Sequence, residues 1–151
     1  MIMSCYHVDR KTAHIYVQTI NEFSPIYIHS RPSAILPLAR YILEEGLFPN
    51  PIRYIFCDGE YLTQGQRRQI EQAFQGRLLN IYGHTEGCVV GIPCPSSNHL
   101  HFLPQVGLVE LVDEQGKVLT EPGSRGELVV TGFNNIVSIL DLDGDRIPEI
   151  L

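Results

Sequence analysis

The chain has 151 residues, of which 44% are hydrophobic and 19% charged, a composition typical of a soluble globular protein with its own core. A formal net charge of −6, with no basic stretch, excludes a nucleic-acid groove that works by neutralising phosphates. No apolar run is long enough to cross a membrane, the N-terminus does not resemble a signal peptide, and the four cysteines have no repeating spacing. We therefore expect a cytoplasmic protein with free thiols.

The first half of the chain alternates helical patterns with short β-rich runs. A capping-box spacing, Thr63 followed by Gln66, marks the start of one helix. The patterns predict helices over about 9–22, 33–45 and 63–75, and strands over 26–28, 52–56 and 78–82. This alternation predicts parallel β-α-β layers over about 10–82.

Two polar loops follow the second and third of these strands. They are Asp58-Gly59-Glu60 and the motif Tyr82-Gly83-His84-Thr85-Glu86. Ligands of parallel sheets bind beyond the carboxyl ends of the strands, so we expect the two loops to lie side by side at one rim. The second loop has the groups of a nucleotide site: an aromatic face for a base, a glycine for a turn, a hydroxyl for a phosphate and a carboxylate for magnesium.

The pattern changes after Gly87, where helical periodicity ends. Strands are predicted over 107–112 and 126–133, with a hairpin turn over 113–117 and a further apolar run over 136–140. These features predict a β-rich, barrel-like subdomain over about 88–140. No linker separates it from the first half, so we expect one domain.

The motif over 82–86 resembles the Tyr-Gly-x-Thr-Glu motif of the adenylate-forming enzymes, which join a carboxylate to AMP and then to a thiol or another acceptor. Three further segments resemble motifs of that family in the same order. They are Asp58–Leu62, Gly123–Thr131 and Gly144-Asp145, which are similar to a Gly-Glu-x-Leu loop, a Gly-x-x-Gly-Glu-Leu-x-x-Thr strand and the end of a Thr-Gly-Asp motif.

The branch that this chain most resembles is the phenylacetate–CoA ligase and CapK-like group. In that branch the tyrosine motif is followed by a cysteine, a histidine and Gly-x-Val-Glu-Leu-x-Asp, which here are Cys94, His101 and Gly107–Asp113. Residues 24–48 resemble the same branch, and the likeness extends over about 20–146.

The resemblance implies a role for each matching residue. Tyr82 would stack on adenine, while Thr85 and Glu86 would be catalytic, touching the α-phosphate and holding magnesium. Asp145 would accept hydrogen bonds from the ribose. The nucleotide-binding residues that the resemblance implies are Gly59, Glu60, Tyr82, Gly83 and Asp145. The implied ligands are ATP or AMP, Mg²⁺, a small carboxylate and CoA.

Two parts of the family pattern have no counterpart in these 151 residues. One is the glycine- and Ser/Thr-rich phosphate loop, which would lie upstream; the other is the C-terminal lid domain with its catalytic lysine. Asp141-Leu142-Asp143 stands where the family has an arginine, a tyrosine and a threonine, and Gly87 replaces an arginine common in the branch. We therefore expect one partial adenylating domain over 1–151, the middle of an AMP-forming carboxylate–CoA ligase that is inactive alone. It could be a gene fragment, a split subunit completed by a companion chain, or a decayed copy.

Other interpretations of the same residues stay open. Tyr82 to Glu86 could be a plain strand-to-loop turn, Glu60 a carboxylate at a helix entry, and the chain a non-catalytic binding module or a decayed copy. His29 and His84 are expected to be structural.

Two metal sites are also conceivable. Cys94 and His101 could bind zinc, although Cys88, Cys94, His99 and His101 do not have the spacing of a standard zinc knuckle. Asp141, Asp143 and Asp145 with Glu149 could bind calcium, although their spacing is not that of an EF-hand.

Overall fold

The computed structural model describes residues 1–94 and 99–133, and these fall into two compact units, one over Met1–Ile81 and the other made of the described residues from Tyr82 onward. Each unit is described by itself. None of the helices in the described residues is long and apolar enough to span a membrane.

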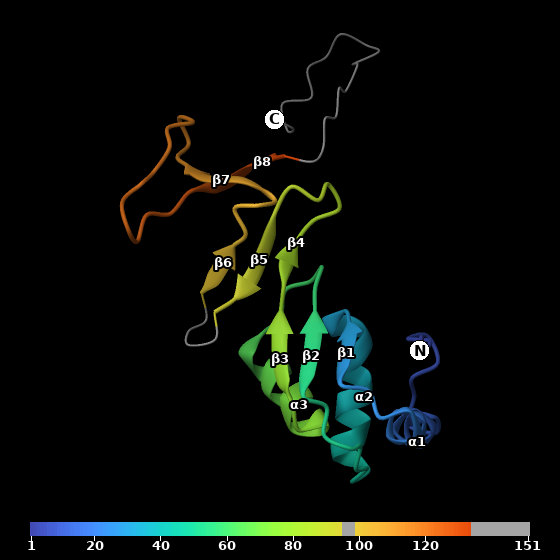
Figure 1. The fold of residues 1–151 in the computed structure, drawn as a ribbon. Helices are drawn as coiled ribbons and strands as arrows, with labels where there is room; N and C mark the ends of the chain where they lie inside the picture. Colours follow the sequence, from blue (N-terminus) through green and yellow to red (C-terminus); the bar gives the residue numbers. More distant parts are fainter. Residues whose placement is uncertain (95–98, 134–151) are drawn as a thin grey trace, which may run out of the picture. The chain divides into compact units, whose positions relative to one another are not determined.

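The first unit confirms the predicted alternation of helices and strands (Figure 1). Its helices and strands, in chain order, are α1 (Ala13–Phe23), β1 (Tyr27–Ser30), α2 (Pro32–Glu44), β2 (Tyr54–Cys57), α3 (Gln64–Phe74) and β3 (Arg77–Asn80). Pro32 occupies the first turn of α2, where its missing N–H has no helical partner to lose. The predicted capping box is also present, because the Thr63 and Gln66 side chains each bond to the other's backbone N–H.

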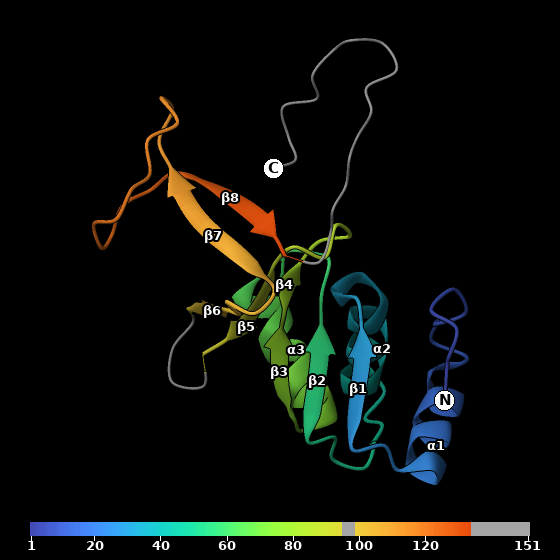
Figure 2. The ribbon, with the colours of Figure 1, turned by 45° about the horizontal axis from the view of Figure 1, so that its top comes forward.

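The three strands form a parallel sheet in the order β1-β2-β3, with Tyr27 opposite Tyr54 and Tyr54 opposite Arg77. Helices α2 and α3 pack on the same face of this sheet (Figure 2). Side chains alternate along a strand, so Ile55 and Leu78 point to the helices and are buried. The core of the unit consists of these two residues with Ala13, Val17, Ile20, Ile35, Leu36, Leu38, Ala39, Ile42, Ile52, Cys57, Ile70, Ala73 and Phe74.

The described residues of the second unit form two small antiparallel sheets. One has the order β4-β5-β6, and the other pairs β7 with β8. The strands are β4 (Tyr82–Gly83), β5 (Val90–Pro93), β6 (Leu100–Phe102), β7 (Gly107–Val112) and β8 (Glu127–Gly132). The predicted turn over 113–117 is confirmed, since the Asp113 N–H bonds to the Lys117 carbonyl at 3.0 Å. The unit is β-rich as predicted, but its described strands form open sheets and no closed barrel.

The predicted strand over 78–82 is divided in the structure. β3 ends at Asn80, the Ile81 N–H still bonds to the Cys57 carbonyl at 2.7 Å, and Tyr82 pairs antiparallel with Gly91 in the other sheet. The change of partner therefore occurs across a single residue. Strands β5 and β6 were not predicted, and the apolar run over 136–140 lies outside the described residues.

Candidate functional site

The loop Asp58-Gly59-Glu60 starts where β2 ends. Cys57 and Asn80 are register partners, so β2 and β3 end at the same edge of the sheet, as the prediction of a common rim requires. Gly59 has a φ of 70°, a backbone conformation that residues with a side chain rarely adopt. The glycine therefore fixes the shape of the loop.

Glu60 binds the first turn of α2. One carboxylate oxygen accepts a hydrogen bond from the Ser33 N–H at 2.8 Å, and the other accepts one from the Ser33 hydroxyl at 2.6 Å. These two bonds hold the pKa of Glu60 below its ordinary value. Glu60 is thus a carboxylate at a helix N-terminus, but the helix is α2 and not the one that follows it in sequence.

Asp58, at the other end of the loop, contacts the end of β1. Its carboxylate lies 2.8 Å from Nε2 of His29, and both side chains are partly exposed. The two carboxylates of the loop are therefore both held by the β1–α2 corner. This leaves the backbone of Gly59, which is exposed, as the surface that the loop presents.

In the second unit, the Tyr82 ring packs against Phe102. The two ring centroids are 5.9 Å apart and the rings are nearly perpendicular, which leaves the tyrosine 39% exposed. Gly91, the register partner of Tyr82, makes this contact possible. A Cβ at Gly91 would lie 3.1 Å from both the Tyr82 Cβ and the Phe102 ring. The Tyr82 ring also contacts the His84 ring, whose centroid lies 6.3 Å away, so the tyrosine is supported by two rings and stays partly exposed.

Residues 84–87 form a tight turn after β4. The Gly87 N–H bonds to the His84 carbonyl at 3.0 Å, and Gly87 has a φ of 67°. Inside the turn, Nδ1 of His84 lies 2.9 Å from Oε2 of Glu86, and the Cys88 sulfur lies 3.8 Å from the same nitrogen. Thr85 is exposed at the tip.

Glu86 suits a hard cation. A hydrogen bond from its own backbone N–H, together with the His84 ring, lowers the pKa of this carboxyl, so it is ionised at neutral pH. Mg²⁺ is commonly bound by one or two protein carboxylates plus substrate phosphates, and one exposed, ionised carboxylate beside a hydroxyl fits that donor set. The role of Glu86 as a magnesium ligand stays a prediction.

The remaining predicted site residues lie outside these two loops. Asp145, with the whole of the possible calcium loop, lies outside the described residues. Cys94 follows β5 and its N–H bonds to the His99 carbonyl at 2.8 Å, while His101 lies in β6 opposite Ile92. The described part of the chain contains no group of three or more His, Cys, Asp or Glu side chains placed to bind a metal. The zinc site stays a prediction.

Sequence reasoning missed two contacts of the first loop. The pairing of His29 with Asp58 could have been found, because β1 and β2 were expected as neighbouring parallel strands and both residues lie at their carboxyl ends. The contact between Ser33 and Glu60 could not be found in this way. It depends on helix α2 beginning at Pro32, which places Ser33 in the first turn, within reach of Glu60. Asn80, at the end of β3, has a buried side-chain oxygen that accepts no hydrogen bond within the described residues.

Comparison with known proteins gives a consistent result. The family model described as AMP-binding enzyme matches residues 2–138. Protein CapK of Staphylococcus aureus is 31% identical over 135 residues, and phenylacetate–coenzyme A ligase of Pseudomonas putida is 35% identical over 129 residues. The matches cover 88% and 78% of this chain but only 28% of each relative, so the chain spans just over a quarter of their length.

Solved structures agree on the fold. A 2-hydroxyisobutyryl-CoA ligase, solved with 2-HIB-AMP and CoA, superimposes on 80% of this chain with a TM-score of 0.64 and 23% sequence identity, and this chain covers 28% of it. The protein VinN superimposes on 79% of this chain with a TM-score of 0.62 and 26% identity, and 32% of it is covered. The chain belongs to the AMP-binding enzyme family and corresponds to a part of the adenylate-forming fold.

Proposed function

We propose that this chain supplies the central part of the nucleotide site of an AMP-forming carboxylate–CoA ligase and acts together with the parts of the domain that it does not contain. The observation that carries the proposal is the family match over 2–138, which includes the turn where Thr85 and Glu86 lie exposed beside the supported ring of Tyr82. The relatives named above include an acid–CoA ligase, which favours this reaction class.

Each residue is assigned one task. Tyr82 provides a face for adenine, with the backbone of Gly83 continuing beside it in β4. Gly59 and Glu60 are assigned to binding of the adenine as well. Thr85 donates a hydrogen bond to an α-phosphate oxygen.

Glu86 is the residue that would hold Mg²⁺, which when bound neutralises charge that develops on the phosphates. The ribose role of Asp145 completes the proposal. The substrates are ATP, a small carboxylate and CoA.

The chain alone should turn over little substrate. Adenylation of a carboxylate depends on positioning and on positive charge that faces the phosphates. The 151 residues contain no glycine- and Ser/Thr-rich phosphate loop and no lysine-bearing lid domain. Loss of even one such donor typically lowers the rate by about a hundredfold or more. A companion polypeptide, or a longer form of the same protein, is needed for activity.

Two measurements test the proposal. Isothermal titration of the 151-residue chain with ATP and Mg²⁺ should show weak binding that Glu86→Gln lowers and Glu22→Gln, on the exposed surface of α1, leaves unchanged. Pyrophosphate exchange with a panel of carboxylates should show negligible turnover by the chain alone.

Two results would contradict the proposal. Substantial adenylate formation by the isolated chain would disprove its dependence on further parts. Absence of ATP binding, both alone and with the rest of a family domain, would favour the non-catalytic binding module.

A further inference from the structure

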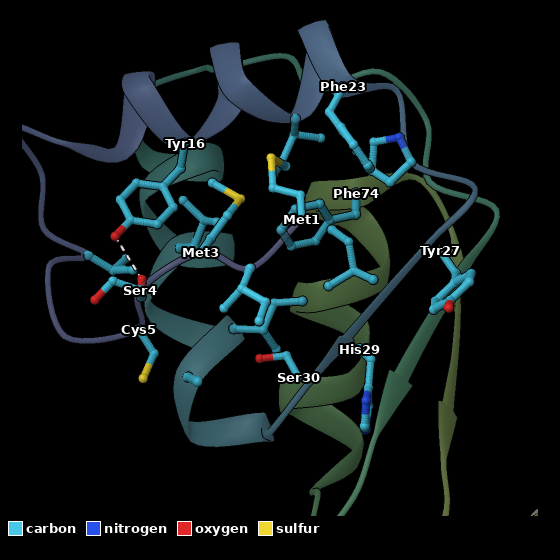
Figure 3. A pocket seen from close by; sticks show the side chains of 18 of the residues that line it. Met1, Met3, Ser4, Cys5, Tyr16, Phe23, Tyr27, His29, Ser30 and Phe74 are labelled. Atoms are coloured by element: carbon cyan, nitrogen blue, oxygen red, sulfur yellow. Dashed lines mark hydrogen bonds between the residues drawn. The ribbon is translucent and has the colours of Figure 1, made fainter.

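The proposed function leaves two features of the molecule without a task. One is a cavity of about 790 Å³ beside β1 in the first unit (Figure 3). Met3 and Phe74 are among the apolar residues that line it, and three others, Phe23, Ile26 and Tyr27, are more than half exposed. None of the described side chains in its lining is that of Asp, Glu, Lys or Arg, so the cavity suits neither a phosphate nor a magnesium ion.

The other feature is the imidazole ring of His84, at the centre of the motif over 82–86. Nδ1 of this ring lies 2.9 Å from Oε2 of Glu86, and the ring is nearly perpendicular to that of Tyr82, with the centroids 6.3 Å apart. Only 33% of the His84 side chain is exposed, compared with 52% of the Glu86 side chain. One ring therefore contacts both side chains to which the proposed function assigns the adenine and the cation.

The contact with Glu86 determines which nitrogen of His84 carries the proton. An ionised carboxylate can only accept hydrogen bonds, so Nδ1 has to be the donor. With a hydrogen on it, Nδ1 has no lone pair with which to bind a metal ion. Glu86, in contrast, can keep this hydrogen bond and bind a cation as well, because a carboxylate has about four acceptor sites. Through this nitrogen, His84 can orient a ligand of the cation but cannot be one.

Cys88 limits the movement of the ring. It is buried, and its sulfur lies 3.8 Å from Nδ1 of His84. It also packs on two glycines that are register partners in β7 and β8, Gly107 and Gly132. A Cβ at Gly132 would lie 2.5 Å from the Cys88 Cβ, and one at Gly107 would lie 2.2 Å from the Cys88 carbonyl oxygen. Because the two strands approach Cys88 this closely, they fix its place and, through it, the place of the ring.

We propose that His84 is a positioning residue: its Nδ1–H orients the Glu86 carboxylate for the cation that accompanies ATP, and Cys88 holds the ring in place. The inference rests on the proposed function, because that function assigns a magnesium ion to Glu86. Carboxylates that bind metals are commonly themselves hydrogen-bonded, and loss of such a partner typically lowers metal affinity or activity by about 10- to 100-fold. The same hydrogen bond fixes the carboxylate before the ion arrives, so less order has to be gained on binding.

The first experiment uses the metal-free chain, so its result does not depend on ATP binding. ¹⁵N NMR of the ring nitrogens distinguishes the two neutral tautomers, and the signals of His84 are identified by their absence from a His84→Asn variant. At about pH 8, where an imidazole is commonly neutral, His84 should carry its proton on Nδ1. Glu86→Ala should remove this preference. A proton on Nε2 in the unaltered chain would overturn the inference.

The second experiment measures ATP affinity by isothermal titration, once with Mg²⁺ and once with EDTA. His84→Leu should weaken binding by about tenfold or more with Mg²⁺ and leave binding in EDTA unchanged. His84→Asn should keep most of the affinity, because its side-chain amide places an N–H donor near the position of Nδ1. His14→Leu, at an exposed histidine of α1, is the matched control and should change neither value.

A double-mutant cycle with Glu86→Gln identifies the residue through which His84 acts. In that background His84→Leu should have little further effect on affinity with Mg²⁺. Equal losses with Mg²⁺ and with EDTA would overturn the inference and show that the ring supports only Tyr82. If the chain binds no ATP, alone or with the rest of a family domain, the proposed function fails and the cation role of His84 fails with it. An Nδ1–H tautomer would in that case still show that the ring holds Glu86.

Discussion

Tyr82 is the residue on which nucleotide affinity should depend most clearly. Stacking of a base on an aromatic side chain is worth about 1–3 kcal/mol, so Tyr82→Ala should weaken ATP binding by about tenfold or more, while Tyr82→Phe should keep most of it. Tyr6→Ala removes a tyrosine that is 91% exposed and serves as the control. Titration calorimetry measures all three. Equal affinity of Tyr82→Ala and the unaltered chain would rule out stacking on this ring.

Glu60 should make the stability of the first unit depend on pH. Its pKa is lower in the folded chain than the ordinary value of 4.5, so its contribution is complete above that value and is lost as pH falls through the lowered pKa. The unaltered chain should exceed Glu60→Gln in free energy of unfolding by about 1 kcal/mol or less at neutral pH. Urea unfolding from about pH 3 to pH 7 tests this.

The comparison with Glu60→Gln also isolates this carboxylate from Asp9, whose pKa is lowered as well. The difference in free energy between the two proteins should be constant above about pH 5 and shrink below it. A difference that grows on acidification would show that the bonds to Ser33 do not form in solution.

At the residue scale, the sequence indicates which side chains are suited to bind a nucleotide, but not which tertiary contacts hold them in place. Tyr82, Thr85 and Glu86 can be singled out because an aromatic, a hydroxyl and a carboxylate within five positions are suited to a nucleotide. That Glu60 would be held by Ser33 depends on how α2 lies over the end of β2. This is a tertiary contact between residues 27 positions apart, for which the local pattern gives no signal.

At the scale of helices and strands, the packing at the two ends of α3 allows the sharpest test. A Cβ at Gly76, just after the helix, would lie 1.7 Å from the Ile52 carbonyl oxygen, so Gly76→Ala should cost about 2 kcal/mol or more. A Cβ at Gly65, in the first turn, would meet no atom closer than 3.9 Å. Gly65→Ala should therefore stabilise the chain by about 0.5–1 kcal/mol through helix propensity.

Thermal and urea unfolding of the two alanine variants measure both effects. Their opposite signs provide an internal control, because the same substitution is made at the two ends of α3. Equal effects at Gly65 and Gly76 would contradict the close approach of the Ile52 backbone to Gly76.

Long or strongly patterned elements were predictable, and short ones were not. The three helices and the parallel strands follow from apolar spacing, Thr63 and the turn residues. β5 contains a glycine and a proline within four residues, and β6 is only three residues long with a histidine at its centre, which hides their alternation. The division of the 78–82 strand could not be predicted either, because the apolar run continues through Ile81 while the pairing partner changes from β2 to β5.

At the scale of the whole chain, the two units differ in how much apolar surface they bury. All but two of the buried apolar side chains among the described residues belong to the first unit; the second contributes Cys88 and Val89. Burial of apolar surface is the main stabilising contribution to folding, so the second unit should open at a lower free energy.

Hydrogen exchange with mass spectrometry tests this difference. Peptides from 82–133 should exchange faster than those covering β2, α3 and β3, and low urea concentrations should widen the gap. Uniform protection across both units would show that the second is stabilised by contacts beyond those within its own described residues.

In the part of the chain that the structure describes, β1 pairs only with β2, and its open outer edge has a consequence for solubility. An unpaired strand edge beside exposed aromatic and aliphatic groups is a template on which strands of other molecules can add without limit. The free chain should therefore lose solubility as its concentration rises.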